Sequence, residues 1–197
     1  MKRIAAGVVA LALAGCAGPP PPPDAFYRLE VAAPAAGKVV LPGVLEIDRL
    51  ATDGVLSERA LAFAAAEGGK LGHYKYDYWS EAPGLMMQDR LAGYLRAAAI
   101  ADRVVTPELR LLADWTVRGK VRRLEQLVGR DAVAVELELA VTSARDGRLV
   151  LQETYARTVP ARSERVEDAV VAAEAGVTEI FVRFLADLVQ ARAGGRP

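Results

Sequence analysis

The fold of this chain is decided by LLADWTVRGKV at residues 111–121, VAVELELAV at 133–141 and LVLQETYARTV at 149–159. Apolar and polar residues alternate in each segment, which is the period of a β-strand with one buried face and one face in water. Asp146-Gly147, between the last two segments, is a strong signal for a two-residue hairpin turn. Because alternation with one wet face is typical of antiparallel sheets, the segments predict neighbouring antiparallel strands.

The first two of these strands carry opposite charges on the face expected in water. The first has basic residues there, such as Arg118 and Lys120, and the second has Glu136 and Glu138. Opposite charges that face each other across a ladder contribute roughly 0.2–1 kcal/mol per pair. The two glutamates are therefore interpreted as a solvated surface and not as an acid–base pair.

Four shorter extended segments precede these strands. Residues 26–29 are expected to form an edge strand, and residues 39–48 a further strand. Residues 59–65 and 71–79 flank the turn sequence EGGK at 67–70, which predicts a hairpin.

A first helix is expected after this hairpin. Ser80 or Glu81 would cap it, and Pro83 would lie in the first turn, where its missing N–H has no cost. The helix is expected to end near Ala99, and residues 100–105 lead into another extended segment. Its apolar side is formed by Met87, Leu91, Tyr94, Leu95 and Ala98.

A long second helix is predicted from about Glu164 to Ala191, with Ser163 as its cap. Its apolar stripe is Val166, Val170, Ala173, Val177, Ile180 and Phe184. Packing of this stripe on the sheet is one interpretation, and a seam between copies of the chain is the other, because the 3.5-residue period also suits a coiled coil. Asp187 interrupts the stripe at its next position and favours packing on the sheet.

The order of strands, helix, strands and helix predicts a single two-layer α+β domain, in which an antiparallel sheet packs against two main helices. This domain is expected over residues 26–192, followed by a flexible tail at 193–197.

The first 15 residues are expected to be a lipoprotein signal peptide. Lys2 and Arg3 precede an apolar run that is too short to span a bilayer. The ending Leu13-Ala14-Gly15-Cys16 resembles the bacterial lipobox, which implies acylation of Cys16 and cleavage before it. An ordinary signal peptide with an incidental cysteine is the alternative, but Cys16 is the only cysteine and stands at the lipobox position. Ala17 follows instead of the aspartate that retains enteric lipoproteins at the inner membrane, so the outer membrane is expected, facing the periplasm.

Residues 16–25 are expected to form a lipid-anchored, proline-rich linker. Five consecutive prolines, Pro19 to Pro23, favour the polyproline II conformation. At about 3.1 Å per residue, the six residues from Gly18 to Pro23 would reach roughly 20 Å from the lipid surface.

Charge and composition exclude several classes of function. Loss of the signal peptide lowers the basic side chains from 25 to 23 against 25 acidic ones, so the mature chain has a net charge near −2. This charge gives no footprint for nucleic acid and no attraction to an anionic membrane.

The residues that could carry catalysis are few. His73 is the only histidine and lies among aromatic residues of a predicted strand, where it is interpreted as a packed or surface residue. The serines at loops and caps lie in no nucleophile elbow; they are Ser57, Ser80, Ser143 and Ser163. No metal-ligand spacing and no phosphate-binding glycine loop is present in the sequence. We therefore expect no enzyme and no cofactor apart from the covalent lipid on Cys16.

Two motifs, RALAF at 59–63 and YKYDYWSEAP at 74–83, are supported by FYRL at 26–29 and DRVV at 102–105. By these motifs the chain resembles the ABC-type transport auxiliary lipoproteins of MCE-type (mammalian cell entry) systems. The resemblance also includes Cys16, the first amphipathic helix and the alanine-rich last helix, and so covers essentially the whole mature chain. Trp79 and Pro83 end a strand and start a helix, so their motif is interpreted as structural and not as a binding site.

This resemblance implies a non-catalytic docking component at the outer membrane, possible as a homo-oligomer. Its partners would be an MCE-domain protein and an inner-membrane ABC permease and ATPase, which move phospholipid or other hydrophobic molecules between the membranes. Two alternatives remain open from the residues: a stand-alone periplasmic lipoprotein that binds a small apolar ligand, and a lipoprotein for envelope assembly.

Overall fold

Strand β6, Trp115–Val128, is the strand around which the others are arranged. It pairs antiparallel with β7, Ala132–Ser143, which pairs antiparallel with β8, Leu149–Pro160. The computed structural model describes residues 20–65 and 70–194, and these three strands confirm the prediction from alternation. The first strand was expected to begin at Leu111, but it begins at Trp115 and continues beyond Val121.

The other edge of β6 is shared by two strands. β2, Leu41–Ile47, pairs with its beginning, and β3, Ala60–Ala65, pairs with its end. Between them Ala51 forms a single bridge to Lys120, just before the short 3-10 helix η2, Gly54–Ser57.

The remaining strands extend the sheet beyond β2 on one side and beyond β3 on the other. β5, Ala101–Val105, lies beside β2, while β4, Leu71–Trp79, forms the predicted hairpin with β3. β1, Ala25–Tyr27, pairs with β4 at the edge, as expected for the aromatic segment near Phe26.

The single α+β domain is confirmed, but its sheet is mixed and not purely antiparallel. The pairs β1–β4, β2–β5, β2–β6 and β3–β6 are parallel. Parallel neighbours need a crossover connection, and between β2 and β5 the chain makes η2, β3, β4 and a helix. The alternation of side chains indicates which face of a strand is exposed to water. It carries no information on the direction of the neighbouring strand, so the parallel pairs could not be predicted from it.

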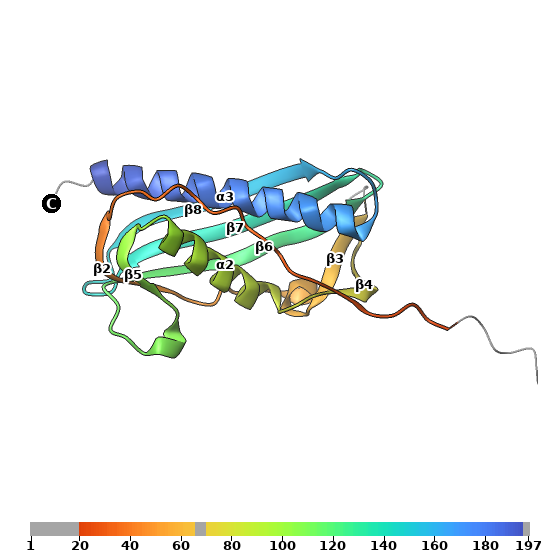
Figure 1. The fold of residues 1–197 in the computed structure, drawn as a ribbon, viewed down its shortest axis with the longest axis horizontal. Helices are drawn as coiled ribbons and strands as arrows, with labels where there is room; N and C mark the ends of the chain where they lie inside the picture. The colour runs from red at the N-terminus through yellow and green to blue at the C-terminus, as the bar shows by residue number, and fades with distance from the viewer. Residues whose placement is uncertain (1–19, 66–69, 195–197) are drawn as a thin grey trace, which may run out of the picture.

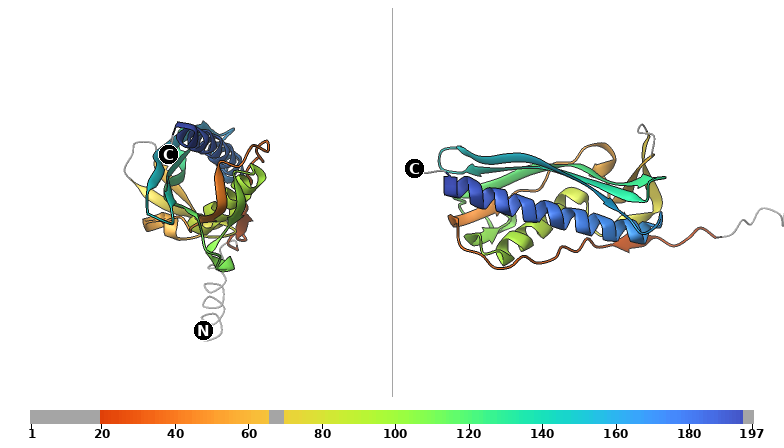
Figure 2. Two further views of the ribbon diagram at one scale, coloured as in Figure 1. Left: turned by 90° about the vertical axis from the view of Figure 1, so that its left-hand side faces the viewer. Right: turned by 90° about the horizontal axis from the view of Figure 1, so that it is seen from above.

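Both helices lie on the same side of the curled sheet (Figures 1 and 2). α2 spans Pro83–Ala97 and α3 spans Val166–Gly194. Rings of Tyr94 and Phe181 join them with centroids 5.4 Å apart. From Val170 to Phe184 the predicted stripe of α3 is buried in the core shared with β7 and β8, which confirms packing on the sheet.

The helix caps differ from the expectation. Ala82, and neither Ser80 nor Glu81, is the N-cap of α2, without a side-chain hydrogen bond, although Pro83 does begin the helix. Ser163 lies before α3; its hydroxyl accepts the N–H of Arg165 at 3.2 Å and donates to the Asp168 carboxylate. The N-terminus of α2 thus has no side-chain cap. At α3 the serine expected as the cap lies three residues before the first helical residue, Val166.

Residues 28–40 form an extended strap between the helices (Figure 1). The side chain of Leu29, near the start of this strap, is fully buried. The N–H of Glu30 donates to the Glu174 carboxylate at 2.9 Å, and the N–H of Gly37 donates to the Ala98 carbonyl at 2.9 Å. The strap carries the chain from β1 at one end of the elongated body to β2 at the other.

The signal peptide, Cys16 and Pro19 lie outside the described residues, whereas Pro20 to Pro23 lie within them and belong to no helix or strand. α3 runs to Gly194, so Ala193 and Gly194 of the expected tail are helical. Within residues 20–65 and 70–194, no helix combines the length and apolar character that crossing a membrane requires.

Candidate functional site

The side chains considered for catalysis do not meet in the structure. His73 is exposed on β4 and lies opposite Ala62 of β3. Ser57 in η2 donates to the Thr52 carbonyl at 3.3 Å, whereas Ser143 ends β7. None of the four serines is hydrogen-bonded to His73, and no three metal-ligating side chains cluster, within the described ranges.

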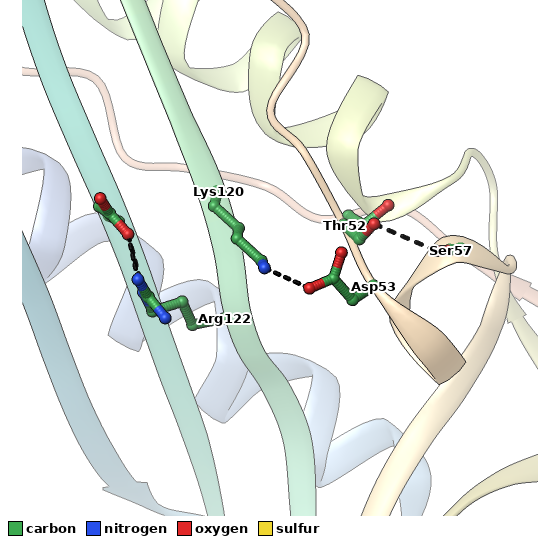
Figure 3. A network of polar contacts seen from close by, with 6 residues as sticks. Thr52, Asp53, Ser57, Lys120 and Arg122 are labelled. Atoms are coloured by element: carbon green, nitrogen blue, oxygen red, sulfur yellow. Dashed lines mark hydrogen bonds and ion pairs between the residues drawn. The ribbon is translucent and has the colours of Figure 1, made fainter.

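Charged side chains on the outer face of the sheet pair with one another, as two ion pairs in Figure 3 show. Arg122 on β6 donates its Nε to Glu138 on β7 at 2.9 Å, which confirms the expected cross-strand pair. This guanidinium holds the pKa of Glu138 below its usual range. The solvated interpretation of the glutamates fits this arrangement, because exposed ion pairs neutralise a surface and stabilise it little.

The two other basic residues of this face have partners that the sequence did not indicate. Arg118 donates to Asp48 at 2.8 Å, and Lys120 pairs with Asp53 (Figure 3). Both acids follow β2, which the parallel pairing brings beside β6. These ion pairs therefore join β6 both to β7 and to the segment after β2, and each of the three cations has an acidic partner.

An apolar loop projects from the end of the body opposite the linker (Figure 1). Residues 106–114 connect β5 to β6 and include the short 3-10 helix η3, Pro107–Leu109. Leu109, Leu111 and Leu112 are 62%, 40% and 94% exposed. We call these three residues the leucine loop. Single exposed leucines are ordinary, but three in one short projecting segment mark a contact surface.

The base of the leucine loop is fixed from three directions. The Asp114 carboxylate accepts the N–H of Val44 and a guanidinium N–H of Arg145, each at 2.9 Å. These two donors lower the pKa of Asp114. The indole of Trp115 donates to the Pro42 carbonyl at 2.9 Å, and the guanidinium of Arg192 from α3 lies 4.8 Å from the Trp115 ring. The leucines are thus held out on a rigid base.

A groove of about 490 Å³ lies between the loop and β5, with Val104, Val105, Leu109 and Leu111 in its lining. The alternation of the sequence predicts Leu111 on the buried face of a strand, but Leu111 precedes β6 and is 40% exposed. The signal that could have corrected it is Pro107 followed by LRLL at 109–112, where the two-residue period breaks at Leu111-Leu112.

The chain matches the family model of the ABC-type transport auxiliary lipoprotein component over residues 27–183. This chain belongs to that family. The matched region runs from β1 into α3, so it includes the strap, the mixed sheet and the leucine loop of this auxiliary lipoprotein. The family assignment confirms the resemblance drawn from the sequence motifs.

Solved structures support the fold of the auxiliary lipoprotein. A Xanthomonas campestris protein of DUF330, which is the same family, is 17% identical, with a TM-score of 0.74 over 86% of this chain and 98% of that one. An uncharacterized protein is 11% identical, with a TM-score of 0.67 over 85% of this chain and 99% of that one. At these identities the likeness concerns the fold alone. No curated protein sequence matches the chain.

The family motif around Trp79 has the structural role that the sequence indicated. Trp79 is buried, its N–H donates to the Arg59 carbonyl at 2.7 Å, and Arg59 Nε donates back to the Trp79 carbonyl at 3.2 Å. The motif of the auxiliary lipoprotein therefore ties β4 to the start of β3 before the chain enters α2 at Pro83.

Proposed function

We propose that this auxiliary lipoprotein is a non-catalytic docking component of an MCE-type system that moves phospholipid or other hydrophobic molecules between the inner and outer membranes. The observation that carries the proposal is the family match combined with the two-ended body. The linker leaves beside β1, and the leucine loop projects from the opposite end.

Attachment to the outer membrane would come from lipid on Cys16. Nine residues lead from Cys16 to Ala25, so a polyproline II linker could span about 28 Å at about 3.1 Å per residue. Two or more acyl chains hold a protein stably in a bilayer, whereas one chain is marginal. The leucine loop, at the far end of the body from this tether, is then left for a protein partner.

The core of the domain gives no support to the alternative in which a small apolar ligand is enclosed beneath α3. The apolar pocket under α3, with Leu61, Trp79, Leu124 and Val170 in its lining, has only about 10 Å³. That volume is about the room for one water molecule, whereas ligand sites measure roughly 300–1,000 Å³. The partners, an MCE-domain protein and an ABC permease with its ATPase, would supply the transport route and ATP hydrolysis.

An affinity purification of the full-length lipidated protein from detergent-solubilised membranes tests this proposal, read by mass spectrometry. We expect recovery of an MCE-domain protein and its ABC permease, and less of both with Cys16→Ala. Leu112→Glu should reduce recovery, whereas Leu71→Glu, a change to a leucine that is 60% exposed at the β3–β4 hairpin, should not. Recovery of lipid or of unrelated envelope proteins alone would replace the proposal with the ligand-binding or envelope-assembly role.

A further inference from the structure

Strand β5, which leads into the leucine loop, is an open edge of the sheet. Over its five residues, Ala101–Val105, it pairs only with β2 among the described strands. The groove of about 490 Å³ beside the loop has all five of these residues in its lining. Successive residues of a strand point to opposite faces, so a groove that touches every one of them follows the edge itself. Open edges are templates for pairing with another strand.

The rest of the lining comes from the leucine loop and from the end of α2. Leu109 and Leu111 line the groove on the loop, and Arg96 lines it at the last turn of the helix. Arg96 donates Nε and Nη2 to the carbonyl of Val104 in β5, at 3.3 and 3.1 Å. The groove thus combines exposed leucine side chains with the main chain of an edge strand, and we call it the β5 slot.

Two cations at the β5 slot have no acidic partner. Arg103 in β5 and Arg110 in the leucine loop are exposed, and neither forms an ion pair within the described residues. The acid of β5, Asp102, accepts a backbone N–H of β2 at 2.7 Å. Hydrogen bonds from the Thr106 hydroxyl and from its own N–H lower the pKa of Glu108 in η3. Both neighbouring acids are therefore bound to donors, and the two guanidinium groups are left for a carboxylate of a ligand.

Only an extended polypeptide uses both the edge strand and the leucines. The main-chain groups of a helix are bonded within the helix, and an acyl chain has no such groups. An extended segment adds to an edge through main-chain hydrogen bonds and places alternate side chains in the pockets beside it. At about 3.3 Å per residue, the five residues of β5 offer an edge of about 17 Å, which is the length of a common strand.

We infer that the β5 slot binds an extended segment of a protein partner, which adds to the sheet as a strand beside β5. The segment has apolar side chains at alternate positions, which pack on Leu109 and Leu111, and a carboxylate that pairs with Arg103. The slot lies at the end of the body opposite the linker, so the tethered protein presents it away from its lipid anchor (Figure 1). This inference rests on the proposed function for the identity of the partner and specifies how that partner is held.

A synthetic peptide tests the slot without the partner. The probe is a seven-residue peptide of alternating leucine and threonine, with glutamate as its central residue and both ends blocked. Its binding to the full-length lipidated protein in nanodiscs is measured by fluorescence anisotropy, with empty nanodiscs as the blank. Methylation of the main-chain N–H groups at one alternate set of residues should weaken binding about tenfold, because these groups point to β5. Methylation of the other set should not, and equal effects of the two sets would overturn the addition of a strand.

Charge reversal tests the inferred ion pair. Arg103→Glu should bind the glutamate peptide about tenfold more weakly and should bind a peptide with a central lysine more tightly than the native protein does. Misfolding cannot produce this reversal. Leu111→Glu should weaken binding of both peptides at least tenfold, whereas Leu71→Glu, at a leucine that is 60% exposed on the β3–β4 hairpin, should leave binding unchanged. Loss of binding without the reversal would contradict the role of Arg103.

A lipid surface is the competing occupant of the leucine loop. Sucrose-loaded vesicles of phosphatidylethanolamine and phosphatidylglycerol should not sediment the protein held in nanodiscs. Sedimentation that Leu111→Glu abolishes, together with no binding of the peptide, would assign the loop to lipid and overturn the inference.

Competition separates failure of the slot from failure of the proposed function. In the affinity purification, an excess of the glutamate peptide should displace the MCE-domain protein. If the peptide binds as expected but native protein recovers no MCE-domain protein, the proposed function fails and the slot is retained. If the MCE-domain protein is recovered equally with the peptide and with Leu111→Glu, the inference fails and the proposed function is retained.

Discussion

The hydroxyl of Tyr155 on β8 donates to the carboxylate of Asp187 on α3 at 3.0 Å. Asp187 is the residue that interrupts the apolar stripe of α3, and this bond is the structural reason for a charge at that position. Burial and the bond to Asp187 raise the pKa of the Tyr155 phenol. The pair therefore holds the long helix to the outermost strand of the sheet.

Tyr155→Phe should lower the free energy of unfolding by about 1 kcal/mol, the usual net value of such a hydrogen bond. Asp187 keeps water and Arg183 as partners, so the loss is not larger. The measurement is urea denaturation. Tyr78→Phe is the matched control, because the Tyr78 hydroxyl is bound to the Lys75 carbonyl at an exposed site. Equal stability of the two variants would show that the Tyr155 bond contributes nothing.

The stability of the protein should fall as pH rises above about 10, the ordinary pKa of tyrosine. Burial and the bond to Asp77 raise the pKa of Tyr27 to about 12, and the pKa of Tyr155 is raised as well. The folded state then holds these protons in a pH range where the unfolded chain has lost them, so deprotonation favours unfolding. Urea midpoints of Tyr27→Phe/Tyr155→Phe should decline less steeply between pH 10 and 12 than those of the native chain. An unchanged slope would contradict the prediction.

Asp114→Asn should destabilise the base of the leucine loop in a pH-dependent way. The Val44 N–H and then Arg145 lower the pKa of Asp114 from its ordinary value of 3.8. A lowered acid pKa contributes stability that is complete above the unfolded value and is lost as pH falls through the folded value. The native chain should be more stable than the variant at pH 7, and the difference should shrink below about pH 4. A difference in urea midpoint that stays constant from pH 7 to pH 3 would count against this role.

Two glycines of α2 should respond in opposite ways to alanine. A Cβ on Gly84 would overlap the Leu50 carbonyl, where the chain after β2 crosses the first turn of the helix. Gly84→Ala should lower the free energy of unfolding by about 1–3 kcal/mol, as overpacking does. A Cβ on Gly93 meets nothing within 4 Å, so Gly93→Ala should raise it by about 0.5–1 kcal/mol through helix propensity. Thermal unfolding of both variants is the measurement. If Gly84→Ala raised the stability, the close approach of Gly84 to the Leu50 carbonyl would be refuted.

Local patterns predicted most of the elements. The alternating aromatic residues predicted β4 with its observed bounds, Leu71–Trp79, because each side chain of a strand reports its own face. The pattern failed within β6, where the ladder skips from Val121 to Arg123 and two arginines oppose Glu136. Such a bulge shifts the period of side chains by one residue, so the alternation predicts the end of the strand at Val121, seven residues too early.

Of the two candidate sites, the sequence predicted the lipid attachment site but not the leucine loop. The lipid attachment at Cys16 comes from the sequence and remains a prediction, as it lies outside the described residues. The leucine loop escaped prediction because Leu111 continues the apolar alternation of β6. The base of this loop is fixed by Asp114, whose carboxylate accepts hydrogen bonds from Val44 and Arg145 in segments distant in the sequence.

By itself the sequence determined the strands, the two amphipathic helices, the α+β class and the family, since periodic side chains and short motifs record local conformation and burial. Only the tertiary structure decided that β2 and β3 share one edge of β6 and that Asp48 and Asp53 pair with two of its cations. It also decided that, among the described strands, β8 pairs with β7 alone. The physical reason is that strand direction and neighbour are fixed by backbone hydrogen bonds between segments far apart in the chain, which every residue can make and no side-chain period records.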